Sequence, residues 1–159
     1  MDAVSYRPLN TEDAAILQEA TVFNLNWESE RFSLADVLGD PKLAHYTTLV
    51  PDRGDFGIVA ESAGSWVGVV WMLFLPEDDP GYGFVAPGVP ELSICVAPGR
   101  RGQGIGSDLM ERALTASRDR GLSSVSLSVE TGNRARDLYV KSGFTPVEGK
   151  TADVLAVTL

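Results

Sequence analysis

The feature that most constrains the fold is a glycine-rich turn placed between two segments of different hydrophobic period. Residues 91–97 alternate between larger apolar side chains and small or polar ones, as a strand with one face in a core requires. Residues 104–120 carry apolar side chains at helical spacing. Gly102, Gly104 and Gly106 lie at the junction, where a backbone without side chains turns most easily. The pattern predicts a strand, a tight turn and a long helix in that order.

Other segments predict further strands and helices on both sides of this unit. Thr11, followed by two acidic residues, is expected to cap a helix that continues through Ala20. Residues 76–90 carry four prolines and three glycines and predict an irregular connection. Strands are expected at residues 5–9, 57–61, 66–75, 125–129, 144–147 and 154–159, and helices at residues 32–38 and 134–141. This order predicts an α/β fold, a mixed sheet flanked by helices, in a single domain over residues 1–159.

Length and composition limit the class of protein. The chain has 159 residues, of which 44% are hydrophobic and 22% charged, as is typical of a globular protein. The longest apolar run, residues 66–75, is shorter than the roughly 18 residues that cross a bilayer, so we expect no membrane partner. Cys95 is the only cysteine and cannot form an intramolecular disulfide, and the first residues show no leader pattern. A reducing, cytoplasmic setting is therefore expected.

The charged residues are distributed unevenly along the chain. The net charge of -9 argues against binding to nucleic acid, which requires a basic surface. Residues 1–99 carry 4 basic and 15 acidic side chains, whereas residues 100–141 carry 8 of the 13 lysines and arginines. An anionic ligand should therefore bind within residues 100–141. The alternative is that these cations only solvate helix faces.

The glycine-rich turn is itself a candidate anion site. The N–H groups in the first turn of a helix lack intrahelical partners, and the helix dipole adds positive charge there, so a phosphate or pyrophosphate fits. The spacing excludes two familiar phosphate loops. A P-loop has lysine where Ile105 follows Gly104, and the dinucleotide fingerprint needs a third glycine where Ser107 stands. The alternative is that the glycines serve only a tight turn.

Two sequence blocks resemble a known family. Residues 101–106, Arg-Gly-Gln-Gly-Ile-Gly, match the Arg/Gln-x-x-Gly-x-Gly/Ala pattern of the GNAT superfamily of N-acetyltransferases, and an apolar strand ending in Val-Ala-Pro precedes them. Residues 135–144, Ala-Arg-Asp-Leu-Tyr-Val-Lys-Ser-Gly-Phe, resemble the family's Ala-x-x-Leu-Tyr-x-x-x-Gly-Phe signature. The resemblance implies the GNAT fold, with a mostly antiparallel central sheet, and an enzyme that transfers acetyl from acetyl-CoA to an amine without a metal.

The resemblance also implies which residues hold acetyl-CoA. In the family the pantetheine arm pairs with the backbone of the fourth strand, which here corresponds to Ile94, Cys95 and Val96. The pyrophosphate lies on the glycine loop, which here comprises Arg101, Gly102, Gln103, Gly104, Ile105, Gly106 and Ser107. The family often has an asparagine seven residues before the signature tyrosine. Here that position is Gly132, and the neighbouring Asn133 is the candidate pantetheine ligand.

Tyr139 and Glu91 are the candidate catalytic residues. Tyr139 belongs to the second block, and its phenol suits protonation of the departing CoA thiolate. The alternative is a core tyrosine that packs beneath the sheet. Glu91 heads the strand that leads into the glycine loop, where a carboxylate could take the proton of an ammonium substrate. The alternative is a solvated acid at the end of a strand.

Other reactive and aromatic side chains are weaker candidates. Cys95 lies mid-strand among apolar neighbours, which favours a buried thiol over a nucleophile. His45 is the single histidine, which leaves little material for a histidine metal site or a Ser-His triad, and it is expected on the surface or in a loop. Trp71 is expected in the core, whereas Trp27 and Tyr82 are candidates for the wall of the acceptor pocket.

The acceptor and the assembly are the least constrained. The resemblance implies direct attack by an amine within a ternary complex, and the acidic first part of the chain favours a cationic small molecule. Acetylation of a peptide or protein amine is an alternative, as is a regulatory module that binds CoA without turnover. The oligomeric state is open, with a homodimer among the alternatives.

Overall fold

One mixed sheet organises the chain. The computed structural model describes residues 2–159, and Met1 of the expected domain lies outside the described residues. The seven strands are β1 (Ser5–Pro8), β2 (Phe56–Ser62), β3 (Ser65–Leu73), β4 (Glu91–Val96), β5 (Ser124–Ser128), β6 (Thr145–Pro146) and β7 (Val154–Thr158), in the spatial order β1-β2-β3-β4-β5-β7-β6. β4 and β5 are parallel, and the other neighbouring pairs are antiparallel. The mixed, mostly antiparallel sheet confirms the expected fold class.

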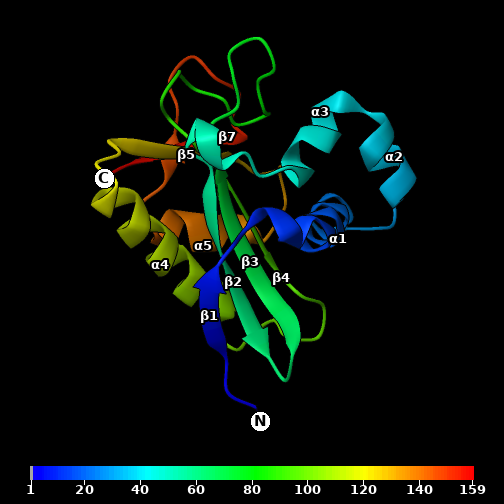
Figure 1. Ribbon diagram of the computed structural model, residues 1–159. Helices are drawn as coiled ribbons and strands as arrows, with labels where there is room; N and C mark the ends of the chain where they lie inside the picture. The colour runs from blue at the N-terminus through cyan, green and yellow to red at the C-terminus, as the bar shows by residue number, and fades with distance from the viewer. Residues whose placement is uncertain (1) are drawn as a thin grey trace.

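Helices cover both faces of the sheet. They are α1 (Ala14–Leu25), α2 (Leu34–Gly39), α3 (Pro41–Ala44), α4 (Ile105–Asp119) and α5 (Ala135–Lys141), with short 3-10 turns η1 (Thr11–Asp13), η2 (His45–Thr47) and η3 (Pro51–Arg53). Figure 1 shows α4 on one side of the sheet and α1, α2 and α3 on the other. Alternation along β3 therefore feeds two cores: Val70 and Met72 pack with residues of α4, whereas Val69 and Trp71 pack with residues of α1.

The unit formed by β4, the glycine loop and α4 confirms the sequence pattern. Leu92 and Ile94 of β4 lie in the core that α4 covers, and Cys95 lies in the core on the opposite face. Helical spacing correctly predicts five residues on the buried side of α4, namely Leu109, Met110, Ala113, Leu114 and Ser117. Ile105, the first residue of the helix, is buried as well. Gly121 follows the helix with φ +75°, a conformation that favours glycine.

The first helical segment is capped by Asn10, so the prediction that Thr11 is the cap is wrong by one residue. The Asn10 side chain accepts a hydrogen bond from Glu12 N at 2.8 Å, and the Asp13 carboxylate accepts one from Asn10 N at 2.9 Å. This reciprocal pair is a capping box, in which both side chains satisfy N–H groups that a helix start leaves free. Asparagine and threonine are both good caps, and only the backbone conformation distinguishes them here.

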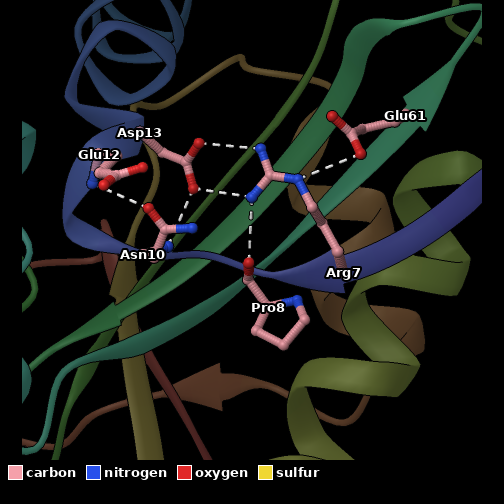
Figure 2. Close-up of polar contacts among 6 residues, drawn as sticks. All are labelled: Arg7, Pro8, Asn10, Glu12, Asp13 and Glu61. Atoms are coloured by element: carbon pink, nitrogen blue, oxygen red, sulfur yellow. Dashed lines mark hydrogen bonds and ion pairs between the residues drawn. The ribbon is translucent and has the colours of Figure 1, made fainter.

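A charged network joins this helix start to the edge of the sheet (Figure 2). The Arg7 guanidinium of β1 donates two hydrogen bonds of 2.8 Å to the Asp13 carboxylate, and its Nε lies 3.1 Å from Glu61 of β2. The guanidinium holds the pKa of Asp13 below its usual range. The network fixes the start of α1, whose other end contributes to the cavity described below.

The segment between α2 and β2 is more ordered than the sequence predicts. Asp40 accepts a hydrogen bond from Lys42 N at 3.0 Å, and Pro41 occupies the first turn of α3, where its missing N–H costs nothing. The chain continues directly into η2. These elements are too short for a hydrophobic period to be visible, which explains why they were not predicted. They bring Tyr46 to the sheet, where its carbonyl oxygen accepts a hydrogen bond from Trp71 Nε1 at 2.9 Å.

Candidate active site

A cavity of about 1120 Å³ opens between β4 and β5. The registered pairing of these two strands is a single pair, Glu91 with Ser126, so the strands diverge towards the glycine loop. The end of α1, the start of the β5–α5 connection and α5 itself complete the walls. Since an edge of β4 faces the cavity, its backbone N–H and C=O groups are available there to an extended ligand.

The cavity contacts the strand that was expected to hold pantetheine. Ile94, Cys95 and Val96 all line it. Burial raises the pKa of the Cys95 thiol to about 12, so this sulfur is protonated at neutral pH and is a poor nucleophile. This agrees with the interpretation of Cys95 as a buried thiol, whose neighbouring backbone rather than its sulfur is useful to a ligand.

The glycine loop forms the other end of the cavity. Arg101, Gly102 and Gly106 line it, and Gly102 and Gly104 have φ values of +78° and +83°. Gly104 is the N-cap of α4, so the free N–H groups of the first helical turn begin there. A Cβ on Gly104 would meet nothing within 4 Å. The glycine is therefore required by backbone conformation, and the space beside it is open.

The structure places other residues of the expected phosphate site away from the cavity wall. The Ile105 side chain is buried in the core, within reach of Gly68 on β3, so only its backbone can meet a ligand. Gln103 is exposed and accepts a hydrogen bond from Arg100 Nε at 3.2 Å. Ser107 lines a separate groove between α4 and α5. The glycine loop therefore presents backbone groups, more than side chains, to a ligand in the cavity.

Asn133 lies on the cavity wall at the start of α5. Its side-chain oxygen accepts a hydrogen bond from Ala135 N at 3.0 Å, and its own N–H donates to Glu130 O at 3.1 Å. These contacts give Asn133 a structural part in starting the helix. Its position beside the cavity leaves the side chain within the region where a pantetheine ligand was expected.

Glu91 is a buried carboxylate at the point where β4 and β5 separate. Glu91 is only 5% exposed, which contradicts the alternative of a solvated acid at the end of a strand. Oε2 accepts a hydrogen bond from the Tyr46 hydroxyl at 2.6 Å, and Oε1 accepts one from Gly83 N at 3.0 Å. Burial raises the pKa of Glu91 to about 7, although both hydrogen bonds favour the charged form. A group with this pKa can both accept and release a proton near neutral pH.

Tyr139 is both a core residue and a cavity residue. Tyr139 is 8% exposed, and its ring packs edge-on against the ring of Phe144, with 6.2 Å between the ring centroids. It also lines the cavity opposite β4. Burial raises the pKa of the phenol above its usual value, which keeps the hydroxyl protonated at neutral pH and makes it a weaker acid than an exposed phenol. The two interpretations of Tyr139 given by the sequence are therefore compatible.

Aromatic side chains from distant parts of the chain line the cavity. Trp27 and Tyr82, the candidates for the wall of an acceptor pocket, both line the cavity, and so does Trp71, which is also buried in the core. Trp27 Nε1 donates to Glu130 at 2.8 Å, and Arg31 lies 3.1 Å from the same carboxylate. Nothing in the sequence pattern connects these residues, and the contact with Glu130 was not anticipated.

His45 is not a surface residue. Its side chain is 8% exposed, its Nδ1 lies 3.1 Å from the Asp79 carboxylate, and its ring packs edge-on against Tyr46. Of the two expected positions, surface or loop, the surface position is wrong for the side chain, whereas the backbone lies in the short turn η2 of the connection between α3 and β2. Within the described part of the chain, no group of three or more His, Cys, Asp or Glu side chains could hold a metal ion. None of the helices in residues 2–159 is both long and apolar enough to cross a membrane.

The sequence is similar to a known protein family and to a curated relative. The model of the acetyltransferase (GNAT) family matches residues 20–144. Mycothiol acetyltransferase of Beutenbergia cavernae is 55% identical over 100 residues, which cover 62% of this chain and 28% of that protein. The chain therefore spans less than a third of the length of this curated relative.

Solved structures share the fold. PaiA N-acetyltransferase of Thermoplasma acidophilum, solved with coenzyme A, superposes with a TM-score of 0.71 at 17% identity over 99% of both chains. YncA of Salmonella typhimurium, solved with acetyl-CoA, gives a TM-score of 0.69 at 21% identity over 99% of this chain and 93% of its own. Since the family model covers most of the chain and the sheet agrees with these structures, the protein belongs to the acetyltransferase (GNAT) family.

Proposed function

We propose that the protein transfers the acetyl group of acetyl-CoA to the amine of a small molecule, within a ternary complex and in a single domain formed by residues 1–159. One observation carries the proposal: a single cavity joins a helix-start glycine loop, a free strand edge and a buried carboxylate with a pKa of about 7. These are the features needed for a diphosphate, for an extended pantetheine arm and for deprotonation of an ammonium.

The glycine loop and β4 hold the cosubstrate in this proposal. The N–H groups at the start of α4 and the Arg101 guanidinium contact the pyrophosphate, with Gly102 and Gly104 allowing the backbone to approach it. The backbone of residues 94–96 pairs with the pantetheine arm, and Asn133 contacts the arm from the opposite wall. The solved complexes of PaiA with coenzyme A and of YncA with acetyl-CoA support acetyl-CoA as the cosubstrate.

The chemistry divides between a base and an acid. Glu91 takes a proton from the acceptor ammonium, directly or through water, and the neutral amine then attacks the carbonyl carbon of the thioester. Backbone N–H groups of β4 stabilise the negative charge that develops on the carbonyl oxygen. As the C–N bond forms, the C–S bond breaks and its electron pair leaves on sulfur. Tyr139 donates its proton to that thiolate and regains one from the attacking nitrogen, which loses its second proton as it becomes an amide. Glu91 then releases the first proton to solvent.

A small-molecule acceptor is supported by the relative and by the cavity. The relative from Beutenbergia cavernae is named a mycothiol acetyltransferase, and a thiol metabolite rather than a protein stands in that name. The aromatic rings of Trp27 and Tyr82 and the carboxylates of Asp40 and Glu91 line the cavity. Aromatic faces and carboxylates favour a cationic amine.

The experiment is a turnover assay with a panel of acceptors. Purified protein is mixed with acetyl-CoA and either small cationic amines or peptides, and free thiol is measured. We expect thiol release with small amines, and a fall of about 10²- to 10⁴-fold in Glu91→Gln. Glu77→Gln, an exposed acid outside the cavity, is the matched control. Release with peptides alone would favour a protein acetyltransferase, and CoA binding without release would favour a regulatory module.

A further inference from the structure

The hydroxyl of Tyr46 lies between the proposed base and a loop. It donates a hydrogen bond of 2.6 Å to Glu91 Oε2 and accepts one of 2.8 Å from Tyr82 N. Tyr46 belongs to η2 and precedes the motif blocks at residues 101–106 and 135–144 by a long stretch of sequence. Its use of both the donor and an acceptor site of one hydroxyl fixes the orientation of that hydroxyl.

The loop segment at residues 81–83 is docked tightly on these two side chains. Gly83 N donates to Glu91 Oε1 at 3.0 Å, and Gly83 O accepts from the Ser126 hydroxyl at 2.7 Å. A Cβ on Gly81 would lie 2.1 Å from Glu91 Oε1 and 2.7 Å from the Tyr46 hydroxyl oxygen. A Cβ on Gly83 would lie 2.6 Å from the backbone of Leu127. Only glycine allows this approach, so the segment is built to lie against the carboxylate.

We propose that Tyr46 is a positioning residue for acetyl transfer: its hydroxyl orients the Glu91 carboxylate and couples it to residues 81–83, which place Tyr82 on the acceptor wall. The inference rests on the proposed function, because it takes Glu91 as the base. Tyr82 is 58% exposed and lines the cavity, whereas its backbone N–H is bonded to the Tyr46 hydroxyl. A fixed backbone therefore positions an otherwise exposed ring beside the cavity.

The hydrogen bonds leave the carboxylate able to act. A carboxylate offers about four acceptor sites, and the protein uses one on each oxygen, so sites remain for a proton from the acceptor. The Tyr46 hydrogen bond favours the charged form and lowers the pKa of Glu91, whereas burial raises it to about 7. Without the hydroxyl, the base would be protonated over more of the neutral range.

The surroundings of Glu91 make Tyr46 the side chain that tunes it. β3 places Leu73 beside Glu91 and β5 places Ser126 there, while the loop contributes the Gly83 backbone. From α1, which packs against β4, Thr21 and Asn24 line the cavity, and neither titrates. Next to Tyr46, His45 Nδ1 lies 3.1 Å from Asp79 Oδ1, a contact that ties the same loop to η2.

Tyr46→Phe tests the inference, because it keeps the ring and removes the hydroxyl. We expect the acid limb of kcat/KM against pH to move upward by about one pH unit and the KM for the acceptor amine to rise, while the KM for acetyl-CoA stays within about twofold. Tyr6→Phe is the matched control, since Tyr6 also donates to a carboxylate, Asp108 at 3.0 Å, outside the cavity. A folded Tyr46→Phe variant with the wild-type pH profile and acceptor KM would overturn the proposal.

A second measurement needs neither turnover nor the variant. In wild-type protein labelled with ¹³C-glutamate and ¹⁵N, the Glu91 carboxyl carbon and the amides of Tyr82 and Gly83 should titrate with one midpoint near the raised pKa of about 7. Absence of a shared midpoint would refute the coupling, even if Tyr46→Phe fails to fold. If no amine is acetylated but the shared titration is present, the proposed function fails while the coupling between Glu91 and the loop remains.

Discussion

At the scale of single residues, Glu91 links chemistry to stability. Its pKa rises from an ordinary 4.5 to about 7 on folding, because burial penalises the charge more than Tyr46 and Gly83 compensate. Between these values the folded protein binds more protons than the unfolded chain. The contribution of Glu91 to the free energy of unfolding is therefore full below about pH 4.5 and is lost as the pH rises through about 7.

Glu91→Gln makes this linkage measurable. Glutamine is neutral at every pH, so the melting temperature of wild type minus that of Glu91→Gln should fall as the pH is raised from 5 to 8, while other titrating groups cancel in the difference. Thermal melts of both proteins across this range provide the check. A difference that does not change with pH would mean that the folded carboxyl titrates as an ordinary glutamate.

Tyr139→Phe separates catalysis from packing at the same scale. Phenylalanine keeps the ring and its contact with Phe144, and removes only the hydroxyl. A CoA thiolate can depart without help, so we expect turnover at saturating acetyl-CoA to fall by about 10²-fold, the lower end for general acid catalysis, with little change in melting temperature. Full turnover in the folded variant would mean that Tyr139 serves only in core packing and not in catalysis.

At the scale of elements, the turn between β4 and α4 carries the cosubstrate. Gly104 and Gly121 flank α4 with φ values of +83° and +75°, and a Cβ on either would meet nothing within 4 Å. Alanine at each position should therefore cost a similar 1–2 kcal/mol of backbone strain, on the order expected for the left-handed region. Only at Gly104 does relief of that strain move the N–H groups proposed to bind pyrophosphate.

We therefore expect Gly104→Ala to weaken CoA binding by about tenfold or more, whereas Gly121→Ala binds CoA as the wild type does. Isothermal titration calorimetry with CoA on both folded variants provides the measurement, and melting temperatures show whether the strain is matched. Equal CoA affinity in the two variants would remove the turn from the binding site.

At the scale of the whole molecule, the cavity joins segments that are distant in the sequence, from the end of α1 to α5. A ligand that binds the cavity of the folded protein and not the unfolded chain raises the free energy of unfolding of the whole protein. CoA at a concentration of 100 Kd should add about 2.7 kcal/mol to the free energy of unfolding. For a chain of this size, that corresponds to an increase in melting temperature of about 5–10 °C.

Thermal melts with increasing CoA test this expectation, with Gly104→Ala as the control that should show a smaller shift at the same concentration. No shift at any concentration would show that the cavity does not bind CoA in the folded state. The amine acceptor alone should shift the melt less, because fewer walls contact it.

The sequence by itself determined the elements whose pattern is local. Alternation predicted β4, helical spacing predicted the buried side of α4, and glycine spacing predicted the turn between them, because period and turn chemistry depend on neighbours in the chain. Glycine spacing beside a cluster of cations identified Gly102 and Arg101 as site residues, and the resemblance of residues 135–144 to the family signature identified Tyr139. All three line the cavity.

Only the tertiary structure decided which of these residues meet distant partners. Tyr46 reaches Glu91 across 45 residues of sequence, and Trp27 reaches Glu130 across 103. No period carries such information, because a period states which face a side chain occupies and not what lies opposite it. The divergence of β4 from β5 is likewise a property of the assembled sheet. The burial of Glu91, and hence its pKa, follows from that packing and from the loop that the glycines at 81 and 83 allow to close on it.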